Sequence, residues 1–175
     1  MKALDKYKNT YRIETTRAQW WNYDADAMYF ITICTRGREH FFGEIVEGEM
    51  KLSPVGVIAD VLWHEIPHHA RFVRLGEFIV MPNHIHGILV IDKKGNALDE
   101  CGEERRYQHQ GKATVSSVVG GYKSSVTRHA NRLGYAFAWQ PRFYDHIIRD
   151  NQSLQRISDY IANNPFCWAD DCYCD

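Results

Sequence analysis

Short apolar runs separated by turn signals predict several strands in this chain. Residues 27–34, 72–81 and 84–91 are rich in β-branched and aromatic side chains, which favours buried strands. Pro82-Asn83 is a turn signal, so the last two of these strands should pair antiparallel. Residues 41–52 contain two glycines between apolar positions, which predicts a hairpin.

A first helix is predicted immediately after that hairpin. Ser53 is a favoured N-cap residue, and Pro54 is tolerated at the first helical position because its missing N–H has no partner there. The helix should end before Pro67. Its expected buried stripe consists of Val57, Ile58, Val61 and Leu62.

A second helix is predicted over residues 114–132 and should stop at Gly134. Gly120-Gly121 weakens the helical pattern, which predicts a close approach of another backbone at this point. The side chains expected to face the core are Val115, Val118, Val119, Tyr122 and Val126.

A last helix is predicted over residues 151–163. Asn151 or Ser153 should cap its start, and Pro165 should stop it. Leu154, Ile157 and Ile161 form its apolar stripe.

The order of the elements is β–α–β–β–α–β–α, with residues 136–149 supplying the last strand or turn. The first six elements match the split β-α-β, ferredoxin-like pattern, which has an antiparallel sheet with helices on one face. The predicted class is therefore α+β, with the C-terminal helix as an addition. A basic arm over 1–26 precedes the domain over 27–168, and an acidic, cysteine-containing tail covers 169–175.

The composition is that of a soluble globular domain, with 45% hydrophobic and 25% charged residues in a chain of 175. No apolar run approaches the roughly 18 residues of a membrane span, and the N-terminus has no signal-peptide pattern. The sequence therefore predicts a cytoplasmic protein. The five cysteines do not suggest a disulfide framework, and the spacing of Cys167, Cys172 and Cys174 does not match a zinc pattern.

A net charge of −1 hides an uneven charge distribution. Eight Lys and Arg residues lie between Arg105 and Arg149, where Asp145 is the one acid. Such a segment favours phosphate contacts, although solvated helix faces would have the same composition. Trp139 is a candidate for stacking on unpaired bases, with a place in the core as its alternative. The candidate DNA-binding residues are Lys112, Lys123, Arg128, Arg132, Trp139 and Arg142.

Two histidines in the third predicted strand form a candidate metal site. Side chains alternate along a strand, so His84 and His86 share one face while Ile85 points to the other. Two imidazoles placed in this way can hold a divalent cation. The alternative is that one histidine caps the strand and the other packs in the core.

The last helix carries a second candidate group. Tyr160 and Asn164 are four residues apart, so they are neighbours at the edge of the helix's buried face. A tyrosine in that position can equally be a packing residue at the rim of the core. An asparagine just before Pro165 can equally be a helix cap.

Three motifs follow one another in a specific order: Asn83-His84-Ile85-His86, the segment from Trp139 to Arg149, and Tyr160 to Pro165 with Asn164. In this combination the chain resembles the REP-associated branch of the small single-tyrosine transposases. These enzymes belong to the HUH endonuclease group, which is named for a His-apolar-His motif. The resemblance extends from about residue 27 to residue 168 and makes 27–168 the catalytic domain.

The resemblance implies a complete active site. His84 and His86 match the histidines that hold Mg²⁺ or Mn²⁺, Asn164 matches the polar residue that completes the metal site, and Tyr160 matches the nucleophile. The implied activity is nicking and rejoining of single-stranded, hairpin-forming DNA through a 5′-phosphotyrosine. Relatives include monomers and homodimers with exchanged helices, so Tyr160 can serve its own histidine pair or a partner's.

Several rival interpretations remain beside this one. Tyr122 and Tyr144 are other candidate nucleophiles, but neither has a polar ligand one turn later. A histidine-triad nucleotide enzyme would need a third histidine where Ile88 stands. A noncatalytic ferredoxin-like module that binds nucleic-acid hairpins would not need the Tyr160 hydroxyl. A domesticated enzyme that acts on chromosomal repeats would share every motif with the enzyme of a mobile element.

Overall fold

The computed structural model describes residues 6–7, 10–11, 21, 25–93 and 114–168. Most of the predicted arm over 1–26, the candidate Lys112 and the tail over 169–175 lie outside these residues. Two short strands near the N-terminus, β1 (Lys6–Tyr7) and β2 (Thr10–Tyr11), pair with each other.

An antiparallel sheet of four strands forms the centre of the described chain. The strands are β3 (Ala27–Cys34), β6 (Val73–Val80), β7 (His84–Ile91) and β8 (Tyr144–Ile148). Their order across the sheet is β6-β7-β3-β8, and each neighbouring pair is antiparallel. A separate hairpin joins β4 (Gly43–Val46) to β5 (Glu49–Leu52), where a hairpin was expected.

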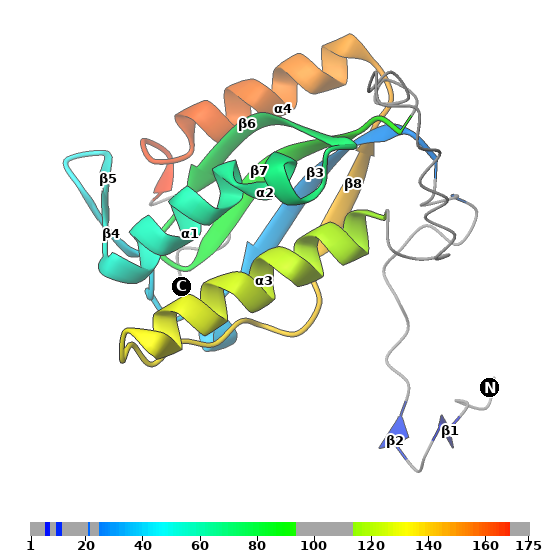
Figure 1. Cartoon of the computed structure of the whole chain (residues 1–175). Coiled ribbons are helices and arrows are strands. Elements are labelled where there is room, and N and C mark those ends of the chain that lie inside the picture. Colours follow the sequence, from blue (N-terminus) through cyan, green and yellow to red (C-terminus); the bar gives the residue numbers. More distant parts are fainter. Residues whose placement is uncertain (1–5, 8–9, 12–20, 22–24, 94–113, 169–175) are drawn as a thin grey trace.

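Helices cover both faces of this sheet (Figure 1). One face carries α1 (Pro54–His64) and α3 (Val115–Arg132), with the short α2 (Ile66–His69) beside them. The other face carries α4 (Asn151–Asn163). A single 3-10 turn, Arg36–Arg38, follows β3. This combination confirms the α+β class, and none of the described helices has the length and apolar character needed to cross a membrane.

Side chains of β3 point alternately to the two faces of the sheet and pack in two separate hydrophobic cores. Tyr29, Ile31 and Ile33 pack in the larger core with residues of α1 and α3. Phe30 lies in the smaller core on the opposite face, with Ile161 of α4. The stripe Leu154, Ile157 and Ile161 therefore fixes α4 on the sheet, as its spacing predicted.

The buried stripe expected for α1 is wrong at Val57 and Val61, while Ile58 and Leu62 pack against the larger core as expected. Val57 and Val61 are 48% and 53% exposed, whereas Ala59 and Trp63 are fully buried. Trp63 determines this orientation, because its ring stacks on Phe78 at 4.6 Å between centroids. Burying the indole removes more apolar surface from water than burying either valine.

The N-cap expected for the last helix is also wrong, although the helix spans the predicted residues. Asp150 is the cap: its Oδ1 accepts a hydrogen bond from the Ser153 backbone N–H at 2.7 Å. This hydrogen bond and a second one from the Ser153 hydroxyl lower the pKa of the Asp150 carboxyl group. A carboxylate at this position also interacts favourably with the positive end of the helix dipole.

The close backbone approach expected at Gly120-Gly121 is wrong, and Gly87 instead allows the close approach of a side chain. A Cβ added to Gly120 or Gly121 would meet nothing within 4 Å. A Cβ on Gly87 would lie 2.3 Å from a ring carbon of Trp63. Gly87 therefore lets Trp63 lie directly on the strand that carries both histidines.

Replacing Gly87 by alanine should lower the free energy of unfolding by about 1–3 kcal/mol, because the indole has to move out of a packed core. Gly120→Ala is the matched control and should raise it by about 0.5–1 kcal/mol, since alanine favours a helix interior. Urea denaturation measures both changes. Equal stability of the Gly87→Ala and wild-type proteins would contradict the close packing.

Candidate active site

The two histidines of β7 lie side by side on the sheet face that α4 covers. Their ring centroids are 4.4 Å apart. His84 and His86 are 0% and 1% exposed, so both imidazoles are withdrawn from water. Alternation along the strand places both on this face and sends Ile85 into the larger core.

A polar partner orients each imidazole through its Nδ1 atom. His84 Nδ1 lies 2.9 Å from Asn83 Oδ1, and an amide oxygen only accepts hydrogen bonds, so this nitrogen carries the proton. His84 Nε2 therefore carries the lone pair. His86 Nδ1 lies 3.0 Å from Thr32 Oγ1, which stands directly opposite on β3.

Asn83 is itself held in place by Thr35, the residue that follows β3. The Asn83 carbonyl oxygen accepts hydrogen bonds from Thr35 N at 2.8 Å and from Thr35 Oγ1 at 2.9 Å. The turn before β7 is thus tied to the end of β3. Hydrogen bonds of this kind to the outer nitrogen of a histidine fix the ring's orientation and tautomer.

Burial keeps His84 neutral. Desolvation lowers its pKa from 6.5 to about 2, and the charges of His86 and Arg38 act in the same direction. At neutral pH the ring therefore retains the lone pair that a metal ion requires.

Tyr160 reaches the histidine pair from α4. Its hydroxyl lies 3.2 Å from His86 Nε2, and the two ring centroids are 5.2 Å apart. Phe30 contacts both rings. Its ring stacks on that of His86 with centroids 5.1 Å apart and lies edge-on to that of Tyr160 with centroids 6.2 Å apart. The Tyr160 residue is 43% exposed, so part of its side chain is accessible from outside the protein.

The C-terminal end of α4 folds towards His84. Asn164 is the C-cap and is 1% exposed, one helical turn beyond Tyr160. Four residues later, Trp168 stacks on His84 with ring centroids 5.9 Å apart. The structure thus brings His84, His86 and Tyr160 into direct contact and buries Asn164 on the same end of the helix.

Among the candidate DNA-binding residues, Lys123 and Trp139 lie in or beside the larger core, whereas Arg142 lies two residues before Tyr144 of β8. Lys123 donates hydrogen bonds to the carbonyl oxygens of Gln140 at 2.7 Å and Arg142 at 2.8 Å, and burial lowers its pKa. Trp139 is 9% exposed, and its Nε1 donates to the Lys123 carbonyl at 3.0 Å. Both side chains thus tie the segment before β8 to α3. The exposed candidates are Arg128, Arg132 and Arg142.

The two rival tyrosines occupy different environments. Tyr122 is buried between α1 and α3, where its hydroxyl donates to the Ala59 carbonyl at 2.8 Å and burial raises its pKa well above 10. Such a hydroxyl has no access to a substrate. Tyr144 is 49% exposed and pairs directly with Thr32, so it lies on the sheet beside the histidines.

Four further residues contact the histidine pair, and the sequence analysis did not predict these contacts. They are Thr32, Asn83, Phe30 and Trp168. Thr32 had one available signal, because it is a polar residue in an apolar strand. Asn83 precedes the histidine it orients, but asparagine after proline also suits an ordinary turn. The contacts of Phe30 and Trp168 depend on where α4 lies.

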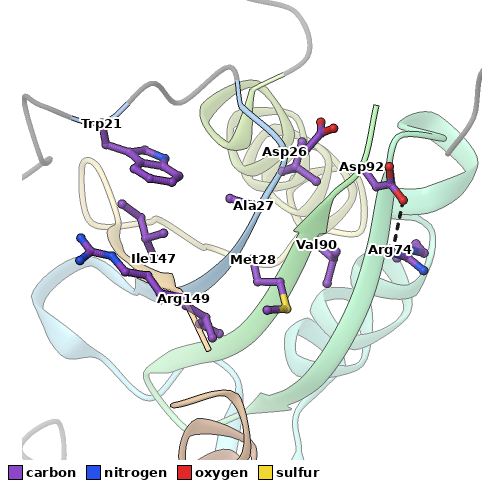
Figure 2. A pocket seen from close by; sticks show the side chains of 11 residues that line it. Trp21, Asp26, Ala27, Met28, Arg74, Val90, Asp92, Ile147 and Arg149 are labelled. Carbon is purple, nitrogen blue, oxygen red and sulfur yellow. Dashed lines mark hydrogen bonds and ion pairs between the residues drawn. The ribbon is translucent and has the colours of Figure 1, made fainter. Parts of the chain in front are cut away.

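A hollow of about 380 Å³ lies at the end of the sheet away from the histidines (Figure 2). Measured along β3, its lining residue Ala27 is about 17 Å from Thr32, which pairs with His86, and about 23 Å from Cys34, which pairs with His84. Charges of both signs line it, and Arg74 forms an ion pair with Asp92 at 3.3 Å. Its other polar and aromatic lining residues include Trp21, Asp26 and Arg149.

Comparison with known proteins relates the chain to one family and to one fold. A protein of Haemophilus influenzae without a functional description is 37% identical over 160 residues, covering 89% of each chain. The chain belongs to the same family as that protein. No family model matches the sequence.

Among solved structures, a REP-associated tyrosine transposase bound to a REP hairpin has a similar fold. Its TM-score is 0.57 with 18% identity, over 86% of this chain and 73% of that one. A Deinococcus radiodurans protein provisionally described as a transposase matches at a TM-score of 0.41 with 15% identity, over 85% of this chain and 97% of that one. The second score is too low to support an argument, and the first establishes a shared fold.

The low pKa of His84 predicts a pH-dependent stability. Below pH 6.5 the unfolded chain binds a proton at this residue that the folded chain does not, so stability falls as the pH falls. Wild type should lose up to about 1.4 kcal/mol per pH unit relative to His84→Asn in metal-free buffer. Urea denaturation at pH 7.5, 6 and 5 measures the difference. Parallel pH profiles would contradict a neutral, buried His84.

Proposed function

We propose that the chain is a metal-dependent, single-stranded DNA nicking and joining enzyme of the transposase type, with Tyr160 as its nucleophile. The observation that carries this proposal is the 3.2 Å contact between the Tyr160 hydroxyl and His86 Nε2. A nucleophilic hydroxyl, partly exposed, lies beside two buried imidazoles that Asn83 and Thr32 orient. A packing tyrosine would not require that arrangement.

The side chains at this site fit a divalent metal ion. His84 is neutral with its lone pair on Nε2, and its ring lies 4.4 Å from that of His86. Asn164 can add a neutral amide oxygen, so His84, His86 and Asn164 would hold Mg²⁺ or Mn²⁺. When bound, the metal ion would neutralise negative charge on the scissile phosphate. The described residues include no group of three or more His, Cys, Asp or Glu side chains that could hold a metal ion.

The proposed reaction exchanges one phosphate ester for another. Tyr160 Oη bonds to phosphorus, the bond from phosphorus to the 3′-oxygen breaks, and the products are a 5′-phosphotyrosine and a free 3′-OH. The proton that the tyrosine loses balances the proton that the 3′-oxygen gains. Attack by another 3′-OH on the phosphotyrosine reverses these steps and rejoins DNA without ATP.

The fold supports this proposal. The order β6-β7-β3-β8, with α1 between β3 and β6 and α3 between β7 and β8, is the arrangement expected for a split β-α-β, ferredoxin-like domain. The similar structure of a REP-associated tyrosine transposase contains a REP hairpin. By that likeness, we propose hairpin-forming single-stranded DNA as the partner.

The contact between Tyr160 and His86 is made within one chain. Exposed Arg128 and Arg132 near the end of α3 offer charge for phosphate contacts away from the site. The alternative of a noncatalytic hairpin-binding module differs in one testable respect, because it does not need the Tyr160 hydroxyl.

Tyr160→Phe should abolish covalent attachment to DNA while preserving DNA binding. A labelled hairpin oligonucleotide with unpaired flanks, incubated with Mn²⁺, should give a covalent adduct on a denaturing gel with wild type. Tyr135→Phe is the matched control, since Tyr135 is 39% exposed and follows α3. It should give as much adduct as wild type. An adduct that persists in Tyr160→Phe would exclude Tyr160 as the nucleophile, and a wild type that binds without an adduct would favour the noncatalytic module.

Thr32→Val should weaken Mn²⁺ binding about 10- to 100-fold, because His86 loses the hydroxyl that orients its Nδ1. Thr127→Val is the control: its hydroxyl bonds the Lys123 carbonyl in α3, away from the site. Titration calorimetry with Mn²⁺ measures both affinities. An unchanged affinity in Thr32→Val would show that Thr32 does not support a metal site.

A further inference from the structure

The sheet face beside Tyr160 is only partly covered by the described helices. α4 packs mainly along β6, at the opposite edge of the sheet from β8. Tyr144 of β8 is 49% exposed, and His146 of the same strand is also exposed. An aromatic side chain this open gains little from burial, which suggests a role other than packing.

The strand register places these two side chains on the same face as the histidine pair. Tyr144 stands directly opposite Thr32, whose hydroxyl bonds His86. His146 stands directly opposite Phe30, whose ring stacks on His86. Residues directly opposite each other in an antiparallel pair point to the same side of the sheet. Phe30, Tyr144 and His146, together with Tyr160, therefore form one aromatic patch around the proposed nucleophile.

Positive charge borders this aromatic patch. Arg142 is exposed and lies two residues before Tyr144 of β8, whereas Arg149 lines the hollow at the other end of the strand. Arg156 lies four residues before Tyr160 on α4, about 40° away round the helix, so it points along the same edge. Two acids of this region are engaged within α4 and its cap: Asp159, next to Tyr160, accepts a hydrogen bond from Gln155, and Asp150 binds Ser153. Flat rings with arginines around them are suited to bases and phosphates of an unpaired strand.

We propose that the aromatic patch binds the bases of unpaired nucleotides next to the cleaved bond, with Tyr144 as the main stacking residue. This inference rests on the proposed function and specifies how its site selects a substrate. Base pairing and stacking in a duplex hide the ring faces that the patch would contact. The patch therefore restricts cleavage to DNA that is unpaired at the bond, and Tyr144 is a positioning residue for the reaction at Tyr160.

Tyr144→Ala should raise the Kd for a hairpin oligonucleotide with an unpaired flank about 5- to 100-fold, as loss of one stacked base does. Tyr144→Phe keeps the ring and should restore most of the affinity that Tyr144→Ala loses. Fluorescence anisotropy in EDTA measures binding without cleavage. Tyr135→Ala removes another exposed tyrosine, which lies outside the patch and is 39% exposed against 49% for Tyr144, and should leave the Kd unchanged.

A double-mutant cycle identifies the base that Tyr144 contacts. Abasic sites introduced one at a time along the flank should weaken wild-type binding at one position and leave Tyr144→Ala unaffected there. The same oligonucleotide with its flank in a duplex should bind wild type and Tyr144→Ala equally.

Two results would overturn the proposal. If Tyr144→Ala binds the unpaired flank as tightly as wild type, the patch does not stack on bases, even if Tyr160 forms its adduct normally. If Tyr144→Phe loses the adduct, Tyr144 acts through its hydroxyl and not through its ring. Weaker binding by Tyr144→Ala alongside a wild type that forms no adduct would support the patch and reject only the proposed cleavage.

Discussion

The antiparallel pairing of β3 with β7 is the interaction on which the candidate site depends. It sets Thr32 opposite His86, so a hydroxyl meets the outer nitrogen of a buried imidazole. At the end of the same pair, Thr35 binds the Asn83 backbone, and Asn83 in turn orients His84. A shift of one residue in this register would turn both histidines into the opposite core. Gly87 also favours this register from the opposite face of the sheet. Trp63 packs against β7 at this position, so a residue with a side chain there would collide with its ring.

The second requirement is the position of α4, which hydrophobic packing supplies. Ile161 is buried against Ile88 of β7, one turn from Asn164 and adjacent to Tyr160. The packing of Ile161 in the smaller core therefore positions α4. In that position the Tyr160 hydroxyl lies 3.2 Å from His86 Nε2. The helix leaves Tyr144 and His146 of β8 exposed on this face, whereas Thr32 of β3 is buried. The same face of the sheet therefore has buried histidines and a partly exposed Tyr160.

Local patterns predicted the strands over 27–34 and 84–91 and the helix over 151–163 at the residues where they occur. Alternation along β7 also placed both histidines on one face, and helical spacing placed Tyr160 at the edge of a buried stripe. The sequence could not predict the face that α1 buries, because Trp63 selects it through Phe78, a residue of a distant strand. Thr32 and Trp168 escaped notice for the same reason, since their contacts depend on strand register and on the path of the chain after α4. The roles of the site residues are predictions that experiment has to test.

Mass spectrometry of the protein–DNA junction tests the central claim most directly. Wild-type protein incubated with Mn²⁺ and a single-stranded hairpin substrate would be digested with protease and nuclease, and the nucleotide-bearing peptide would be sequenced. The geometry predicts a 5′-phosphate linked to Tyr160 Oη and to no other residue. A linkage on Tyr144, or complete reaction of the DNA with no protein-linked nucleotide, would contradict the assignment of Tyr160 as the nucleophile beside the histidine pair.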